Sequence, residues 1–115
     1  MTPCKHGQVI LVPFPFTDLS TVKQRPALVI SSDEFNDESG DVIIAAITSN
    51  VDPYRDSVDV YVLSGVEQTQ AGLPKESAIR LGKIITLDQR LIRSELGSLP
   101  SKTLTTVTKI IHKIV

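Results

Sequence analysis

Arg25, Thr48 and Ser49 have side chains that could hold a phosphate group. Arg25 carries a planar guanidinium whose paired N–H donors match phosphate oxygens, and the following Pro26 favours an extended backbone that fixes where the side chain departs. Thr48 ends an apolar run and could donate its hydroxyl to the same phosphate, with Ser49 beside it as a second donor. The alternatives are a plain surface arginine at the start of a strand and a threonine that caps a turn.

Arg80 is a further candidate, because it lies in an apolar context between Ile79 and Leu81. An unpaired charge buried among such residues would be costly, so its guanidinium must reach solvent, an acid or a phosphate. A structural salt bridge and a contact with a phosphate both remain open for this side chain.

The chain has no sequence pattern typical of a metal, a cofactor or a disulfide. Cys4 is the single cysteine, so it cannot form an internal disulfide, and with only His6 and His112 no zinc-ligand spacing occurs. We expect Cys4 to be a free thiol near a mobile terminus and both histidines to be structural or incidental. Charge stabilisation at a reaction centre is therefore expected from arginine and hydroxyl donors, without a metal or a cofactor.

Length and composition predict one domain over residues 1–115. A chain of 115 residues, 41% of them hydrophobic, can bury roughly two-thirds of its unfolded surface in a single core. No run approaches the ~18 apolar residues that a membrane span needs, and no basic segment followed by an apolar one opens the chain. We therefore expect a cytoplasmic protein that does not enter a membrane.

The net charge of −1 is unlike the basic balance usual in nucleic-acid binders. Its distribution weakens that objection, because five of the 13 acids lie in residues 33–41, a stretch without lysine or arginine. The rest of the chain has an excess of four positive charges. The acidic stretch itself is expected to be a solvated connection, and the remainder could present a basic face.

Short apolar and β-branched runs predict an antiparallel β fold. Pro13 and Pro15 interrupt the first run, which should end at a sheet edge or bulge, and Gly82 divides the last two, which suggests a bulge or sharp bend. Residues 64–76 form a connection near the length at which loops become functional, so substrate or partner contacts could lie there. The predicted strands cover residues 8–16, 25–31, 41–48, 57–63, 77–81 and 83–87, with connections at 17–24 and 33–40.

Helical structure is predicted in two places near the end of the chain. Asp88 could cap a helical turn through Ile92, and Ser101 is the expected N-cap of a terminal helix. That helix should pack on the sheet through an apolar stripe, which consists of Leu104, Val107, Ile111 and Ile114. The predicted fold class is therefore mainly β with α, a small barrel of bent antiparallel strands with a C-terminal amphipathic helix.

Three segments together resemble the MazF/PemK toxin family. Residues 7–31 (GQVILVPFPFTDLSTVKQRPALVIS) are similar to its opening signature of a Gly-led strand, a polar loop and an Arg-Pro that begins a second strand. Residues 45–50 (AAITSN) resemble its Thr-Ser strand end, and residues 79–88 (IRLGKIITLD) its later arginine-containing strand. The terminal amphipathic helix also fits, so the resemblance spans nearly the whole chain in the correct order.

This resemblance implies an SH3-like barrel of the kind shared by MazF and CcdB, assembled as a symmetric homodimer. It implies a metal-independent endoribonuclease that cleaves single-stranded RNA sequence-selectively by 2′-hydroxyl attack, leaving a 2′,3′-cyclic phosphate and a 5′-hydroxyl. It also implies a cognate antitoxin whose acidic, disordered segment lies across the RNA site, with operator DNA bound only through the antitoxin. A function at a membrane is not implied.

Residue by residue, the resemblance makes Arg25 and Thr48 the catalytic pair. Some family members have an acid two residues after the later arginine, where this chain has Gly82, and a histidine or glutamate in the first loop, where it has Leu19 and Ser20. The usual general base is therefore missing. Asp18, Lys23 and Lys83 are the nearest replacements, and proton transfer by any of them requires reach to the reacting atoms. The candidate RNA-binding residues are Ser49, Arg80, Lys23, Asp18 and Lys83.

Two other functions fit the same predicted barrel. One is a non-catalytic toxin that binds a protein target, like the CcdB gyrase poisons, and needs no phosphate-binding arginine. The other is an inactive RNA- or peptide-binding SH3-like module, which the missing acid favours. Arg25 and Thr48 together favour the nuclease.

Overall fold

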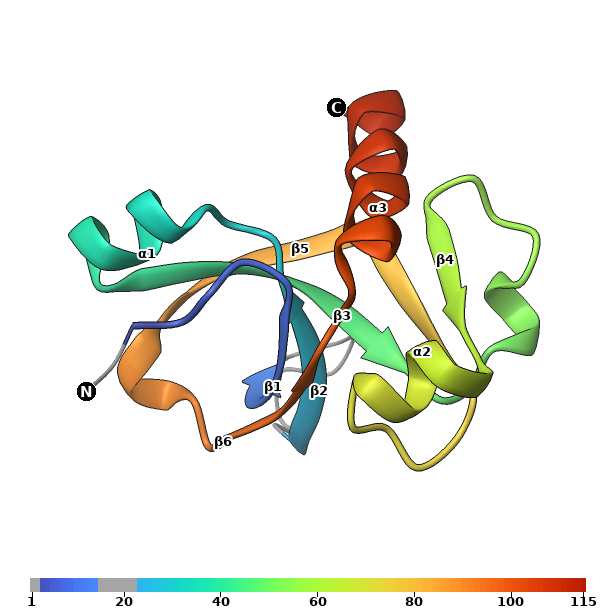
Figure 1. Ribbon diagram of the computed structural model, residues 1–115, viewed down its shortest axis with the longest axis horizontal. Helices are drawn as coiled ribbons and strands as arrows, with labels where there is room; N and C mark the ends of the chain where they lie inside the picture. Colours follow the sequence, from blue (N-terminus) through green and yellow to red (C-terminus); the bar gives the residue numbers. More distant parts are fainter. Residues whose placement is uncertain (1–2, 15–22) are drawn as a thin grey trace.

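The computed structural model describes residues 3–14 and 23–115, and its described strands form one six-stranded antiparallel sheet (Figure 1). The strand order is β4-β5-β3-β2-β1-β6. The predicted fold class, mainly β with α, is confirmed. The strands are β1 (Gln8–Phe14), β2 (Lys23–Val29), β3 (Asp41–Thr48), β4 (Val60–Leu63), β5 (Ser77–Asp88) and β6 (Ser94–Ser98). The helices are α1 (Asp33–Ser39), α2 (Gly65–Gln70) and α3 (Ser101–Ile114), with 3-10 turns η1 (Asp52–Tyr54) and η2 (Gln89–Leu91).

The curl of the sheet depends on β5, which pairs with β3 over almost its whole length. The register shifts in the middle of the ladder, since Ala45 pairs with Ile84 and Ala46 with Arg80. Gly82 lies in this bulge, where a β-carbon would overlap the carboxylate of Asp59. The bulge predicted at Gly82 is confirmed, within one continuous strand rather than two.

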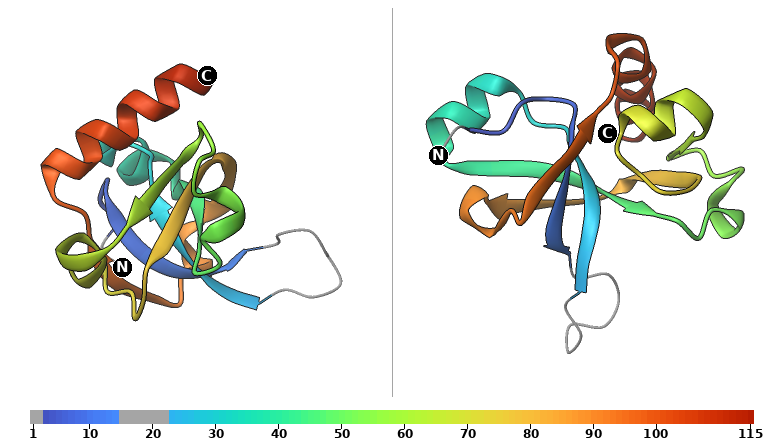
Figure 2. Two further views of the ribbon diagram at one scale, coloured as in Figure 1. Left: turned by 90° about the vertical axis from the view of Figure 1, so that its right-hand side faces the viewer. Right: turned by 60° about the horizontal axis from the view of Figure 1, so that its bottom comes forward.

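The sheet has one face covered by helices, and we call it the helix face. Leu28, Ile47 and Ile79 of this face are fully buried in a cluster that includes Val107 of α3. Figure 2 shows α3 lying across this side of the curled sheet. The other predicted members of the stripe, Leu104, Ile111 and Ile114, pack against the same cluster, so the predicted amphipathic helix is confirmed. Its N-cap is Pro100, whose carbonyl accepts from Leu104 N–H at 3.1 Å, and not Ser101 as predicted.

The opposite face of the sheet, which we call the arginine face, contains a second cluster. Val12, Ala27 and Ala46 belong to it and are fully buried. Directly paired residues share a face, so Arg25, which pairs with Val12, and Arg80, which pairs with Ala46, also lie on this side.

Two glycines, Gly72 and Gly97, allow α2 to pack closely against β6 and so to close the curled sheet without strand pairing at this contact. A β-carbon at Gly72, whose φ is +75°, would overlap the carbonyl oxygen of Leu96, and one at Gly97 would overlap the carbonyl oxygen of Gln70. The end of α2 therefore lies directly against β6, and we call this contact the glycine seam. In Figure 2 (right) α2 lies beside the end of β6 that leads into α3.

A half-buried carboxylate anchors α2 to its surroundings. Glu67 of α2 accepts from the Tyr61 hydroxyl of β4 at 2.8 Å to each carboxylate oxygen, and also from the Thr103 hydroxyl of α3. Burial, followed by the neighbouring Glu67 carboxylate, raises the pKa of Tyr61. The helix that begins the 64–76 connection is thus fixed to both β4 and α3.

Several local predictions differ from the structure. Residues 33–40, predicted as a connection, form α1, which Ser32 caps by accepting from Phe35 N–H at 3.1 Å and which ends at Gly40 with φ +74°. The 64–76 connection contains α2, and β6 had no predicted counterpart. The predicted first strand extends to residue 16, and residues 15–22 lie outside the described part. Asp88 does cap the turn η2, accepting from Arg90 N–H at 2.8 Å.

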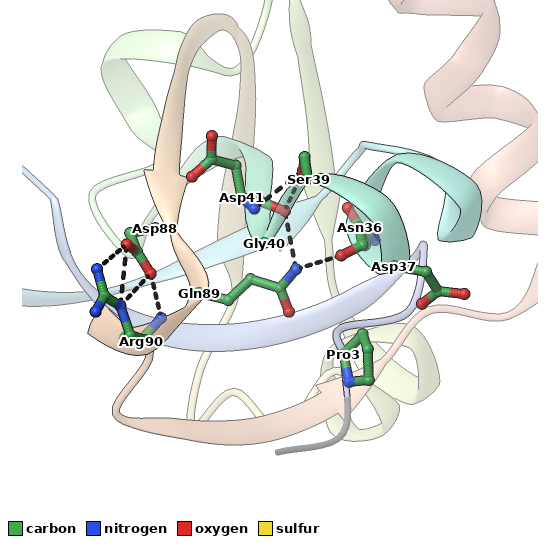
Figure 3. Close-up of a pocket in the computed structure, with 9 residues that line it drawn as sticks. All are labelled: Pro3, Asn36, Asp37, Ser39, Gly40, Asp41, Asp88, Gln89 and Arg90. Carbon is green, nitrogen blue, oxygen red and sulfur yellow. Dashed lines mark hydrogen bonds and ion pairs between the residues drawn. The ribbon is translucent and has the colours of Figure 1, made fainter.

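Cys4 is buried, which corrects the expectation of a thiol at a mobile terminus. It is a free thiol, and burial, followed by the charge of Glu95, raises its pKa. The Gln89 side chain holds this segment in place. Its Oε1 accepts from Cys4 N–H at 3.0 Å, while its Nε2 donates to the backbone carbonyls of Asn36 (2.8 Å) and Asp41 (2.9 Å). Figure 3 shows Gln89 between α1 and the start of β3. No helix in the described ranges is long and apolar enough to cross a membrane.

Candidate functional site

Arg25 and Thr48 come together where β2 begins and β3 ends. The β2–β3 ladder pairs Ala27 with Ala46, and Arg25 and Thr48 are each two residues further along, next to each other on neighbouring strands. Arg25 is exposed and Thr48 is partly buried. Both line a cavity of about 270 Å³, together with Ser49. The structure therefore brings together the three residues from which the phosphate hypothesis started.

Among the described residues, two cations and no carboxylate line this cavity. Arg25 and Lys75 are the charged members of its wall. Six apolar side chains form much of the remainder: Leu11, Pro26, Ile47, Leu73, Pro74 and Leu96. An anionic ligand with an apolar part suits such a lining, because the charged groups neutralise it and the apolar wall excludes water.

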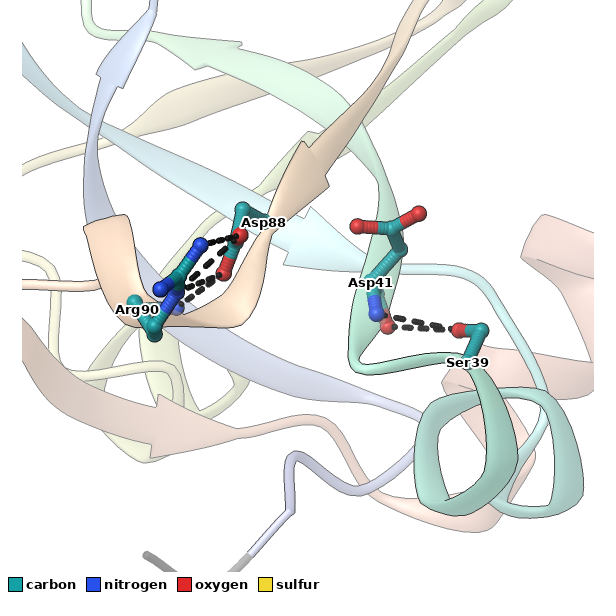
Figure 4. A network of polar contacts seen from close by, with 4 residues as sticks. All are labelled: Ser39, Asp41, Asp88 and Arg90. Atoms are coloured by element: carbon teal, nitrogen blue, oxygen red, sulfur yellow. Dashed lines mark hydrogen bonds and ion pairs between the residues drawn. The ribbon is translucent and has the colours of Figure 1, made fainter.

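A second hollow, of about 380 Å³, has the opposite electrostatic character (Figure 3). Asp37, Asp41 and Asp88 line it, and Arg90 is the cation among them. Arg90 is bound to Asp88, with its Nη2 2.8 Å from Oδ2 (Figure 4), and this hydrogen-bonded partner lowers the pKa of Asp88. A polyanion would be repelled here. The cavity at Arg25 is therefore the better candidate for binding a phosphate.

Thr48 caps a turn and still has a proton to donate. Its Oγ1 accepts from Asn50 N–H at 3.1 Å, which fixes the oxygen at the end of β3. A hydroxyl has one donor hydrogen and two acceptor positions, so this bond uses an acceptor position and leaves the O–H available. The two alternatives considered for Thr48, a turn cap and a phosphate donor, are thus compatible.

Lys75 was not among the predicted site residues. It lies in the 64–76 connection, whose length indicated functional contacts without identifying a residue. The connection is shaped by bonds that sequence spacing does not reveal: Leu73 N–H donates to the Gln68 carbonyl at 3.1 Å, and Gln68 Nε2 donates to the Leu73 carbonyl at 3.2 Å. The Ser77 hydroxyl donates to the Lys75 carbonyl at 3.0 Å, which turns the chain into β5.

The acid that follows Lys75 in sequence is paired elsewhere. Glu76 accepts from Arg55 at 2.8 Å, and Arg55 also contacts Asp52 at 3.2 Å. The hydrogen bond that Arg55 donates to Glu76, followed by the one that it donates to Asp52, raises the pKa of Arg55. Lys75 is consequently not the cation that neutralises Glu76.

Arg80 lies on the arginine face beside Thr48 but does not line the cavity. It pairs with Ala46, and its strand neighbour two residues earlier, Ala78, pairs with Thr48. Its guanidinium lies 4.1 Å from the centre of the Tyr54 ring, an attractive cation–π contact. Its Nε is buried and has no hydrogen-bond partner among the described residues. The Arg80 guanidinium thus contacts an aromatic ring, a partner that was not among the solvent, acid or phosphate expected from the sequence.

The family is shown by comparison with known proteins. Residues 5–115 match the sequence model of the family described as "PemK-like, MazF-like toxin of type II toxin-antitoxin system". This chain belongs to that toxin family. The resemblance noted in residues 7–31, 45–50 and 79–88 is therefore confirmed.

The individual MazF-like proteins compared with this chain share a third or less of the aligned residues with it. The Endoribonuclease MazF of Staphylococcus saprophyticus is 33% identical over 78 residues, which cover 68% of this chain and 62% of that relative, less than two-thirds of its length. An endoribonuclease in complex with its cognate antitoxin from Mycobacterial species superposes with a TM-score of 0.75 at 18% identity, covering 96% of this chain and 92% of that one. MazE-MazF (Form-II) from Deinococcus radiodurans gives 0.75 at 21% identity, covering 99% and 96%. These structures show that the MazF fold is shared.

Three further predicted residues of this MazF-like chain, Lys23, Arg80 and Lys83, are not part of the described cavity wall. Lys23 is exposed at the start of β2, two residues before Arg25 and on the same face. Lys83 lies in the β5 bulge, next to Gly82. Asp18 falls outside the described residues. Arg25, Thr48 and Ser49 are thus grouped at the cavity, whereas Lys23, Arg80 and Lys83 surround it or lie further along the sheet.

Proposed function

We propose that this protein is the toxin of a type II toxin–antitoxin pair and cleaves single-stranded RNA sequence-selectively. The 2′-hydroxyl of one nucleotide attacks the adjacent phosphorus, so the 2′-O–P bond forms while the bond from phosphorus to the 5′-oxygen breaks. The 2′ proton leaves to a base and the departing 5′-oxygen takes up a proton. The products are a 2′,3′-cyclic phosphate and a 5′-hydroxyl.

The observation that carries this proposal is the joint position of Arg25 and Thr48 at one cavity, where Lys75 adds a second positive charge. Attack by the 2′-oxygen builds negative charge on a phosphorus that bears five oxygens, and donors already in place lower that barrier most. The Arg25 fork binds two non-bridging oxygens, and the Thr48 hydroxyl, held by Asn50, donates to one of them. Ser49 supplies a second hydroxyl at the same strand end.

Metal independence is part of the proposal. The arginine fork and the hydroxyl donors supply the charge stabilisation that a divalent cation provides in other nucleases. Lys75 adds a second positive charge at the cavity.

The partners that we propose are a second copy of the chain and an antitoxin. The fold is shared with solved structures described as an endoribonuclease with its cognate antitoxin and as MazE-MazF complexes. An acidic, disordered antitoxin segment would meet the positive charges of Arg25 and Lys75 at the cavity, so it would compete with RNA for them. Operator DNA would be bound only through the antitoxin.

The test is incubation of the purified protein with a long single-stranded RNA, followed by mapping of the new 5′ ends and analysis of both termini. Discrete sites with 5′-hydroxyl and 2′,3′-cyclic phosphate ends are expected. An intact RNA, combined with growth arrest that persists in an Arg25→Ala variant, would instead identify a toxin that acts on a protein target.

A further inference from the structure

Tyr54 is a partly exposed aromatic residue in the connection that follows β3. It ends the turn η1, and its ring belongs to neither of the two apolar clusters that form the core. Its hydroxyl has no hydrogen-bond partner among residues 3–14 and 23–115. Neither core packing nor a bond to the hydroxyl therefore explains an aromatic side chain at this position.

The ring is held in place by its own backbone and by Arg80. Tyr54 N–H donates to the carbonyl of Val51, a buried residue, at 2.9 Å, and Ser57 N–H donates to the Tyr54 carbonyl at 3.0 Å. The Arg80 guanidinium lies over one face of the ring, 4.1 Å from its centre. A ligand that meets this ring therefore loses less free energy to ordering the protein than it would on a freely rotating side chain.

Arg80 brings a positive charge to the ring that no carboxylate of the described chain neutralises. It forms no ion pair there, and its buried Nε has no hydrogen-bond partner. Asp52, the acid in the same turn as Tyr54, is bound by Arg55 at 3.2 Å. An aromatic ring backed by an arginine is the combination on which proteins stack the bases of single-stranded nucleic acids.

The strand register places this pair near the proposed phosphate ligands. Thr48 lies beside Arg25 on one side and pairs with Ala78 on the other, and Arg80 lies two residues beyond Ala78 on β5. Two strand spacings and two residue rises put the α-carbons of Arg25 and Arg80 about 12 Å apart on the arginine face. Tyr54 is thus outside the cavity wall but within reach of an RNA strand whose phosphate lies at Arg25.

Resting on the proposed function, we propose that Tyr54 is a stacking platform for one base of the RNA outside the cavity at Arg25. The base lies on the ring face opposite to Arg80. Stacking requires only the flat face of a base, so the platform accepts all four bases. It therefore adds affinity and fixes the path of the strand past Thr48, without selecting a sequence.

Tyrosine fluorescence tests the contact directly. The chain has no tryptophan and two tyrosines, so a Tyr61→Phe variant leaves Tyr54 as the single fluorescent tyrosine. Once the cleavage site is mapped, a short RNA with a single 2′-deoxyribose at the attacking nucleotide binds without being cleaved. Its binding should quench the emission of Tyr54, because a base comes to lie on the ring. An abasic residue at the contacted position should abolish the quenching.

Affinities of the same RNAs for three variants separate stacking from other effects. Tyr54→Leu should weaken binding by roughly 5- to 150-fold, the contribution of one stacked base, and should remove the sensitivity to the abasic residue. Tyr54→Phe should keep both, since the ring remains. Phe35→Leu is the matched control: it removes a partly exposed ring from α1, which precedes the start of β3, and should leave the affinity unchanged. Melting curves check folding.

The possible results have different meanings. Emission from Tyr54 that stays unchanged in the RNA complex overturns the inference, and so does an equal loss of affinity in Tyr54→Phe and Tyr54→Leu, which would assign binding to the hydroxyl. A contacted position that tolerates only one base also overturns it. A folded wild-type protein that neither binds nor cleaves RNA refutes the proposed function itself, whereas cleavage that does not depend on Tyr54 refutes only the platform.

Discussion

Conversion of Arg25 to alanine is the most direct test of the proposed chemistry. If the guanidinium holds two non-bridging oxygens in the transition state, its loss should lower the single-turnover cleavage rate by about 10²- to 10³-fold, as loss of one preorganised oxyanion donor does. This corresponds to about 2.7–4 kcal/mol of barrier. Lysine should restore little of the rate, because it keeps the charge and loses the two-pronged geometry.

Folding should be almost unaffected by the same change. Arg25 is exposed at the start of β2, and substitutions at such positions usually change the free energy of unfolding by no more than about 0.5 kcal/mol. A melting curve checks this. Arg90→Ala is the matched control, since it removes an exposed arginine that lines the acidic hollow instead of the cavity. A folded Arg25→Ala protein that cleaves RNA at the wild-type rate would refute the reasoning, and so would full rescue by lysine.

Four further expectations concern metal, assembly and stability. Cleavage should continue in EDTA, and activity that requires Mg²⁺ after chelation would contradict the mechanism. Light scattering at tens of micromolar, roughly the range where a specific interface holds, should give about twice 12.5 kDa, and a monomer alone would exclude the homodimer. Gln89→Leu removes three hydrogen bonds, those to the backbone N–H of Cys4 and to the carbonyls of Asn36 and Asp41, so chemical denaturation should show a loss of about 2–5 kcal/mol; an unchanged midpoint would mean that water replaces the amide. Gly97→Ala should cost about 1–3 kcal/mol by pushing α2 from β6, and wild-type stability would mean that the seam adjusts freely.

The sheet and half of the site could be predicted because their signals are local. The apolar runs of β1, β2 and β3 carry β-branched residues at the spacing of strands, and a glycine inside β5 indicated its bulge. Arg25 was recognisable from the proline after it, and Thr48 from its place at the end of an apolar run. These residues lie together because β2 and β3 are antiparallel neighbours.

The parts that escaped prediction depend on contacts between distant segments. Residues 94–98 (SELGS) are not β-branched, and they form β6 by pairing with β1 while Gly97 admits the end of α2. Residues 33–39 have the composition of a solvated loop, and the cap at Ser32 with the left-handed Gly40 makes them a helix. Lys75 joins the site only because the turn before β5 brings it beside Arg25, and nothing in its sequence neighbours indicates this.

The glycine seam separates the enclosure of the cavity from the composition of its wall, so evolution could change the wall without opening the cavity. Gly72 and Gly97 hold α2 against β6 through backbone atoms, so the enclosure of the cavity depends on two positions that accept no side chain. Leu73, Pro74 and Lys75 follow directly and face the cavity without making that contact. Descendants of this sequence could therefore exchange these three residues, and change what the cavity binds, while inheriting the same closed sheet.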